Sequence, residues 1–223
     1  MITWSVDDVS AAQTLPTWFD VSVMALNGLL GAAIARSRNT PIYGTLLAAV
    51  LVGLGGGMVR DVLLGQEPVA ISQPAYIPAV LLGGIIGALV FGRVLRKQSH
   101  FALIQGIVFG FLVTIGAQKA LDDDAPIVSA IALGVVTASF GGMLADVLAG
   151  YRATVARQAH WVASALVVGS TVFVLASIWL GFWPAVIAGV AVTGTLRFVS
   201  QVRNWPSPRW PGESTTTPDN PAP

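Results

Sequence analysis

Two aspartates, Asp61 and Asp146, each follow a cluster of glycines inside a long apolar stretch. Asp61 belongs to residues 55–65 and Asp146 to residues 140–150. A carboxylate attracts cations, and main-chain carbonyls that glycine leaves unshielded can replace part of a cation's water shell. Both features are costly in lipid unless they line a pathway. The pattern therefore predicts passage of cations.

The two glycine-containing segments are copies of one another. Seven of their eleven positions are identical at an offset of 85 residues, whereas chance would give about one match. The same offset pairs Gly31 with Gly116 and Ala35 with Ala120. The sequence therefore contains a duplication that extends beyond the two segments.

Composition indicates an integral membrane protein. Of the 223 residues, 54% are hydrophobic and only 10% are charged, against about 25% charged residues in a soluble domain. A helix needs about 20 apolar residues to cross about 30 Å of hydrocarbon. Seven such spans are predicted, at residues 18–35, 42–64, 75–92, 101–120, 127–149, 161–180 and 183–199. The expected fold class is all-α, with no room for a separate soluble domain.

Loop charges predict the orientation of these spans, because short cytoplasmic loops carry the excess of basic residues. Ten of the twelve basic residues lie at or beyond the ends of the first, third, fifth and seventh spans: Arg36, Arg38, Arg93, Arg96, Lys97, Arg152, Arg157, Arg197, Arg203 and Arg209. The alternate loops contain no lysine or arginine, and their charged residues are all acidic: Asp7, Asp8, Glu67, Asp122, Asp123 and Asp124. We expect a cell (inner) membrane protein with its N-terminus outside and its C-terminus in the cytoplasm.

An odd number of spans in each copy makes the two copies enter the membrane from opposite sides. The sequence thus predicts an inverted 3+3 repeat of residues 18–92 and 101–180, followed by an extra helix at 183–199. Residues 1–17 are expected to form an outer tail. Residues 200–223 are polar and rich in proline, and such a composition predicts a disordered cytoplasmic tail.

Several other functions are not expected. The basic residues follow membrane sidedness, whereas a nucleic-acid partner would require a basic patch. His100 and His160 lie far apart, so a metal site from them is not expected, and there is no cysteine. The chain lacks a P-loop and a zinc-protease motif. We therefore do not expect an enzyme.

The glycines are expected to bend or unwind their helices. Gly55, Gly56 and Gly57 fall in the second predicted span, and Gly141 and Gly142 in the fifth. Each glycine costs a helix about 1 kcal/mol relative to alanine. Close helix packing is the alternative role for such small residues. The duplication and the following aspartates favour the pathway over packing alone.

Charged residues near the glycines suggest a pathway with ionised side chains at its mouths. Arg60 is adjacent to Asp61, and adjacent helical residues do not face one another, so Arg60 is expected to pair with another helix or with lipid. Asp61 should lie near the outer mouth and Asp146 near the inner mouth. Lys119 is the only lysine in a span. It either gates cations or reaches the interface to pair with residues 122–124.

The sequence resembles the prokaryotic branch of the trimeric intracellular cation (TRIC) channel family over roughly residues 18–199. The motifs that carry the resemblance are the run Gly-Gly-Gly-Met-Val-Arg-Asp-Val-Leu-Leu-Gly, its second copy, and Gly116-Ala117-Gln118-Lys119-Ala120. The resemblance implies a homotrimer whose subunits each have a pore, lined by kinked second and fifth spans, for monovalent cations with K⁺ foremost. It also implies no cofactor other than bound phospholipid near the kinks, and a gating role for Lys119. Ala145 departs from the family, which usually has arginine there.

Two other functions stay open at this stage. Proteins of this kind have also been described as glycine transporters, and inverted repeats with broken helices suit alternating access as well as a pore. A transporter would hold a closed site for a small amino acid, whereas a channel requires a continuous wet path. The third alternative is a membrane scaffold or lipid-binding protein, in which Asp61 and Asp146 serve stability alone.

Overall fold

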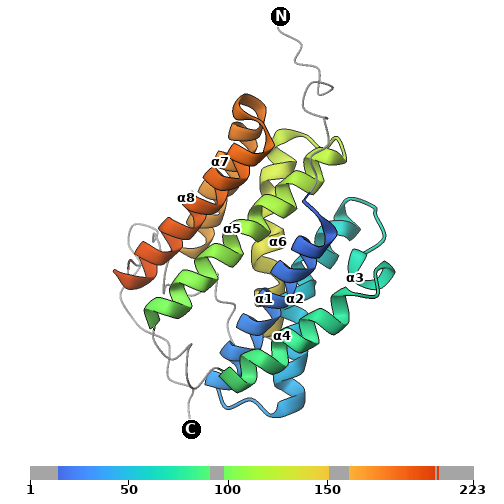
Figure 1. Cartoon of the computed structure of the whole chain (residues 1–223), viewed down its shortest axis with the longest axis vertical. Coiled ribbons are helices and arrows are strands. Elements are labelled where there is room, and N and C mark those ends of the chain that lie inside the picture. Colours follow the sequence, from blue (N-terminus) through green and yellow to red (C-terminus); the bar gives the residue numbers. More distant parts are fainter. Residues whose placement is uncertain (1–14, 91–97, 151–160, 204, 206–223) are drawn as a thin grey trace, which may run out of the picture.

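The computed structural model describes residues 15–90, 98–150, 161–203 and 205 (Figure 1). Most of the two predicted tails lies outside these residues, as do Arg93, Arg96, Lys97, Arg152, Arg157, His160 and Arg209. The described residues form helices and no strand. These are α1 (Thr17–Ser37), α2 (Ile42–Leu63), α3 (Val69–Ser72), α4 (Tyr76–Val90), α5 (Gln98–Asp122), α6 (Ile127–Leu148), α7 (Val162–Leu180) and α8 (Phe182–Val202).

The predicted spans correspond to seven of these helices. Six of them, α1, α2, α5, α6, α7 and α8, are long and apolar enough to cross a membrane, and α4 is apolar but shorter. The all-α fold class is therefore confirmed. The sequence analysis missed α3, a helix of only four residues.

Prolines and glycines mark where the helices begin and end. A proline stands immediately before α1, α2, α3 and α6, where its fixed φ and missing N–H are tolerated. Gly65 and Gly150 follow the ends of α2 and α6 with φ of 70° and 75°. These two glycines are equivalent in the duplication, so both copies end this helix with the same left-handed residue.

The helices pack as two groups of three plus one. Helices α1, α2 and α4 contact one another, as do α5, α6 and α7, and α8 packs on α5 and α7. Figure 1 shows α4 on one side of the bundle and α7 and α8 on the other, with α2 against α6 between them. Asp20, near the start of α1, and Lys119, near the end of α5, lie at the same end of the bundle, so these equivalent helices run in opposite directions. The arrangement agrees with an inverted repeat.

The two ends of the bundle carry different charges. We call one the Asp61 end, where the described loops hold Glu67 and residues 122–124, and the other the Asp146 end, where Arg36, Arg38 and Arg203 lie. Between these ends, large apolar side chains such as Leu82, Leu89 and Ile187 are exposed on the outside of the helices. Exposed apolar surface of this extent suits contact with lipid.

Candidate functional site

The glycines of the duplicated segments lie where α2 and α6 cross. A Cβ on Gly56 would collide with the carbonyl group of Thr137, and a Cβ on Gly141 would lie 2.6 Å from the carbonyl oxygen of Leu51. Gly55 is at the same crossing, because its Cβ would be 3.2 Å from the Cα of Gly141. Glycine at these positions lets the two backbones approach closely.

The next glycine of each copy borders a cavity. Gly57 lies on a small cavity at the Asp61 end, and Gly142 lies on a large cavity at the Asp146 end. A Cβ on Gly142 would meet no atom within 4 Å. Thus the equivalent residues Gly56 and Gly141 serve the helix crossing, whereas the equivalent residues Gly57 and Gly142 border cavities on opposite sides of it.

Unwinding at the glycines, one of the two expected distortions, is wrong, whereas the other, a bend, stays a prediction. Helices α2 and α6 continue through Gly55, Gly56, Gly57, Gly141 and Gly142 without a break. The physical reason is that glycine costs a helix only about 1 kcal/mol, whereas an unpaired main-chain group in lipid costs several. Close packing, the alternative weighed from the sequence, accounts for the crossing.

Asp61 is the centre of an ion-paired cluster at its end of the bundle. The residue is 1% exposed. Its Oδ1 accepts hydrogen bonds from Arg60 Nε at 2.9 Å and Lys119 Nζ at 3.1 Å, and its Oδ2 accepts one from the main-chain N–H of Val69 at 3.0 Å. The carboxylate therefore links α2, α3 and α5.

A second pair of polar side chains, joined by a hydrogen bond, lies at the same end of the bundle. The hydroxyl of Tyr76, at the start of α4, donates to Asp20 Oδ2 of α1 at 2.6 Å. Asp20, Tyr76, Arg60 and Asp61 border a cavity of only about 10 Å³, which has room for about one water molecule. This cavity is thus too small to hold anything larger than a water molecule.

One expectation about the charges at this end is wrong, and Lys119 has a partner that neither of its two alternatives named. Arg60 does not reach another helix, because its long side chain folds back to place Nη2 2.7 Å from Oδ1 of its neighbour Asp61. The rule that adjacent positions diverge applies to Cβ directions, and arginine is long enough to overcome it. Lys119 bonds with Asp61 and not with residues 122–124. The role of Lys119 in gating stays a prediction.

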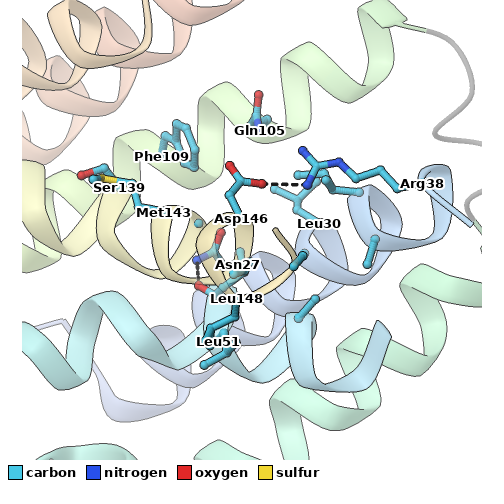
Figure 2. A pocket seen from close by; sticks show the side chains of 18 of the residues that line it. Asn27, Leu30, Arg38, Leu51, Gln105, Phe109, Ser139, Met143, Asp146 and Leu148 are labelled. Atoms are coloured by element: carbon cyan, nitrogen blue, oxygen red, sulfur yellow. Dashed lines mark hydrogen bonds and ion pairs between the residues drawn. The ribbon is translucent and has the colours of Figure 1, made fainter. Parts of the chain in front are cut away.

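Asp146 lies in a cavity of about 400 Å³ (Figure 2). Its Oδ1 is 2.7 Å from Nη1 of Arg38, the residue that follows α1. In Figure 2 the carboxylate projects from α6 toward Arg38, with Gln105 of α5 above it and Asn27 of α1 below it. The cavity extends to Leu51 and Gly142, so it reaches the crossing of α2 and α6.

Arg38 explains how the chain accommodates Ala145. In the first copy Asp61 bonds with the arginine that precedes it, but Ala145 cannot make that bond before Asp146. Arg38, which follows α1, supplies a guanidinium instead. The mouths were expected to be acidic, but both aspartates are ion-paired with basic residues.

Sequence reasoning missed three polar groups on the wall of the large cavity. Arg197 of α8 is 3% exposed and donates through Nη2 to Gln105 Oε1 at 2.6 Å. Asn27 donates through Nδ2 to the carbonyl of Val52 at 2.5 Å. The available signal was the presence of polar residues inside apolar spans. Arg197 was counted with the cytoplasmic charges, although it lies within α8.

The described helices hold no group of three or more histidine, cysteine, aspartate or glutamate side chains suited to a metal ion. Asp61 and Asp146 are instead ion-paired near the C-terminal ends of α2 and α6. Such an arrangement can attract, exclude or release charged solutes.

Comparison with known proteins identifies the family in both halves of the chain. A family model described as "Glycine transporter" matches residues 17–91 and 102–177. These two segments begin at the same offset that separates the two glycine clusters. The inner membrane protein YadS of Escherichia coli K12 is 27% identical over 135 residues, which are 59% of this chain and 65% of that protein.

A membrane protein of Vibrio cholerae is 31% identical over 150 residues, 65% of this chain and 62% of that protein. The chain thus spans slightly less than two thirds of the length of these two curated relatives.

Solved structures show the same fold. The TRIC trimeric intracellular cation channel orthologue from Rhodobacter sphaeroides is 28% identical with a TM-score of 0.75, covering 83% of this chain and 96% of that chain. A structure described under conductance through TRIC cation channels has a TM-score of 0.77 at 23% identity, covering 90% of this chain and 100% of that chain. This protein therefore has the TRIC channel fold and belongs to the membrane protein family whose model is described as "Glycine transporter".

Proposed function

We propose that this chain is a channel for monovalent cations, K⁺ foremost, with a pore beside the crossing of α2 and α6. The observation that carries the proposal is the 400 Å³ cavity, which extends from the Asp146 end to the crossing. Beyond the crossing, the cluster around Asp61 closes the route with a cavity of about 10 Å³. A wide entrance followed by a compact ionic barrier is the arrangement expected of a closed channel.

The barrier consists of contacts that a small movement can break. Lys119 belongs to α5, whereas Asp61 and Arg60 belong to α2. Withdrawal of Lys119 leaves Asp61 with Arg60 and the main-chain N–H of Val69, so the carboxylate keeps two of its three kinds of donor. Movement of α5 relative to α2 then opens a polar route without leaving Asp61 unpaired in the membrane.

The proposal also includes the orientation of the channel in the membrane, its assembly and its bound lipid. The Asp146 end faces the cytoplasm, because Arg36, Arg38 and Arg203 lie there and acidic residues lie in the loops of the opposite end. The subunits form a homotrimer, a proposal supported by the description of the Rhodobacter sphaeroides relative as trimeric. Bound phospholipid is the ligand proposed beside the permeant ion. Structural neighbours described as channels support a non-enzymatic role.

A transporter of glycine or a similar small amino acid is the second candidate, because the matching family model bears that description. One observation favours it, since a cavity open at one end and closed at the other also suits one state of an alternating-access transporter. The 400 Å³ volume is ample for glycine. The two functions differ in whether the route ever becomes continuous.

Flux from proteoliposomes separates these functions. We would load vesicles with KCl, follow K⁺ efflux by the quenching of a pH-sensitive dye in the presence of a proton ionophore, and measure uptake of labelled glycine with the same preparation. Protein-dependent K⁺ efflux without saturable glycine uptake is the expected result. Saturable glycine uptake without K⁺ efflux would contradict the channel, and the absence of both fluxes would favour a scaffold.

A further inference from the structure

Arg197 is a buried cation on the wall of the 400 Å³ cavity. Its Nη2 donates to Gln105 Oε1 at 2.6 Å, and its guanidinium carbon lies 5.4 Å from the centre of the Phe109 ring. Neither neighbour neutralises the charge, because the amide is neutral and the ring offers only its quadrupole. Arg197 therefore keeps a full positive charge inside the protein.

Two nitrogen atoms of Arg197 also lack a hydrogen-bond partner in the part of the chain that the structure describes. Nε and Nη1 are buried and unpartnered among the described residues. The ion pairs found there join Arg38 with Asp146 and Asp61 with Arg60 and Lys119, and they leave Arg197 out. Arginine does not lose its proton in proteins. Among the described residues that border the cavity, Arg38 and Asp146 are thus ion-paired with each other, and Arg197 is a positive charge to which none of the ion pairs supplies a counter-charge.

A fixed charge on the wall of a pore acts most strongly on multivalent ions. Low-dielectric walls focus its field into the cavity. At about 10 Å through water, a unit positive charge lowers the local concentration of a monovalent cation by about twofold and that of a divalent cation by about fourfold. Added salt weakens the effect because it screens the charge.

We propose that Arg197 is a selectivity-determining residue, which limits entry of divalent cations and reduces K⁺ current through the cavity. This inference rests on the proposed channel function and deepens it. A purely structural role, in which Arg197 only joins α8 to Gln105 of α5, predicts loss of stability without a change in ion selectivity. The two roles therefore differ in measurable ways.

The test compares Arg197→Met, which removes the charge, with Arg197→Lys, which keeps it. Gln105→Glu is a second neutralising variant, because it places a carboxylate beside the guanidinium without removing Arg197. Arg36→Gln is the matched control, since Arg36 is an exposed arginine near the same end and does not border the cavity. Unitary K⁺ conductance would be recorded at about 0.05 M and about 1 M KCl, and the Ba²⁺ to K⁺ permeability ratio would be taken from reversal potentials.

We expect R197M and Q105E each to raise the low-salt K⁺ conductance and the Ba²⁺ to K⁺ permeability ratio by about twofold. The difference in conductance should vanish at high salt, and R197K and R36Q should behave as the unsubstituted protein does. Unchanged conductance and permeability in both neutralising variants would overturn the inference while the channel stands. A change of equal size at low and high salt would also overturn it, because screening must reduce an electrostatic effect. Silence of the unsubstituted protein would overturn the channel function and this inference together.

Discussion

Replacing Lys119 with glutamine removes the cation that α5 contributes to the cluster around Asp61. Nζ of Lys119 lies 3.1 Å from Asp61 Oδ1, and the lysine side chain is 28% exposed against 2% for the aspartate. Asp61 keeps its bonds with Arg60 and with the N–H of Val69. The substitution therefore weakens the link between α5 and α2, and we expect the closed arrangement to lose stability relative to an open one.

The size of this effect follows from the exposure of the pair. A hydrogen bond to a charged group contributes about 1.5–3 kcal/mol when buried, and an exposed ion pair contributes about 0.2–1 kcal/mol. A bond between a partly exposed lysine and a buried aspartate falls between these values, at about 1–2 kcal/mol. We thus expect the ratio of open to closed times to rise by about 5- to 30-fold.

Open probability in single-channel recordings is the appropriate measurement. Lys119→Arg keeps the charge and should stay close to the unsubstituted channel. Gln118→Ala is the matched control on the same helix, because Gln118 bonds with Asp122 and not with Asp61. Unchanged open probability in K119Q, in a protein that folds and conducts, would refute the role of this ion pair in closing the pore.

Two further predictions concern the helix crossing and the large cavity. Gly56→Ala places a methyl group against the Thr137 carbonyl. We expect it to destabilise the protein by about 1–3 kcal/mol and to lower the thermal unfolding midpoint. Gly142→Ala is the control, because its methyl group enters open space and should leave the midpoint unchanged. Equal midpoints for the two variants in a thermal melt would contradict the packing role of Gly56. Arg38→Gln leaves the negative charge of Asp146 in the cavity, and Asp146→Asn leaves the positive charge of Arg38 there. Low-salt K⁺ conductance should rise in the first and fall in the second by about twofold, and changes of the same sign would argue against an electrostatic effect.

The membrane-spanning helices could be predicted because each is a long apolar run bounded by strong local signals. Helix α6, for example, begins after Pro126 and ends before Gly150. Helix α3 could not be predicted, because four residues carry no helical periodicity. Its first N–H is bonded to Asp61, a contact between residues that lie apart in sequence. That short helix thus depends on tertiary structure more than on its own residues.

The sequence allowed the main charged residues of the candidate site to be predicted, but not the partners with which they interact. Duplication and the rarity of charge in apolar spans singled out Asp61, Asp146 and Lys119. Their partners depend on side-chain reach, so the bond of Arg60 to its own neighbour was not foreseen. The pairing of Asp146 with Arg38 joins residues 108 positions apart, and no local pattern indicates it.

The glycines show the same limit at the level of the main chain. Helix propensity suggests that three consecutive glycines weaken α2, and this suggestion is correct for an isolated helix. In the folded protein the outcome depends on what lies opposite each glycine. Gly56 faces the Thr137 carbonyl at the crossing, whereas Gly142 faces open space. Residues of one type therefore have two roles that only the structure distinguishes.

The most direct test of the central claim is single-channel recording of the purified protein in planar bilayers under a KCl gradient. The account predicts discrete unitary currents that reverse near the K⁺ equilibrium potential. Bilayers without protein provide the baseline, and a gradient of a large cation such as N-methylglucamine tests that the current depends on K⁺. Electrically silent bilayers, with saturable glycine uptake by the same protein in vesicles, would contradict the channel and establish a transporter.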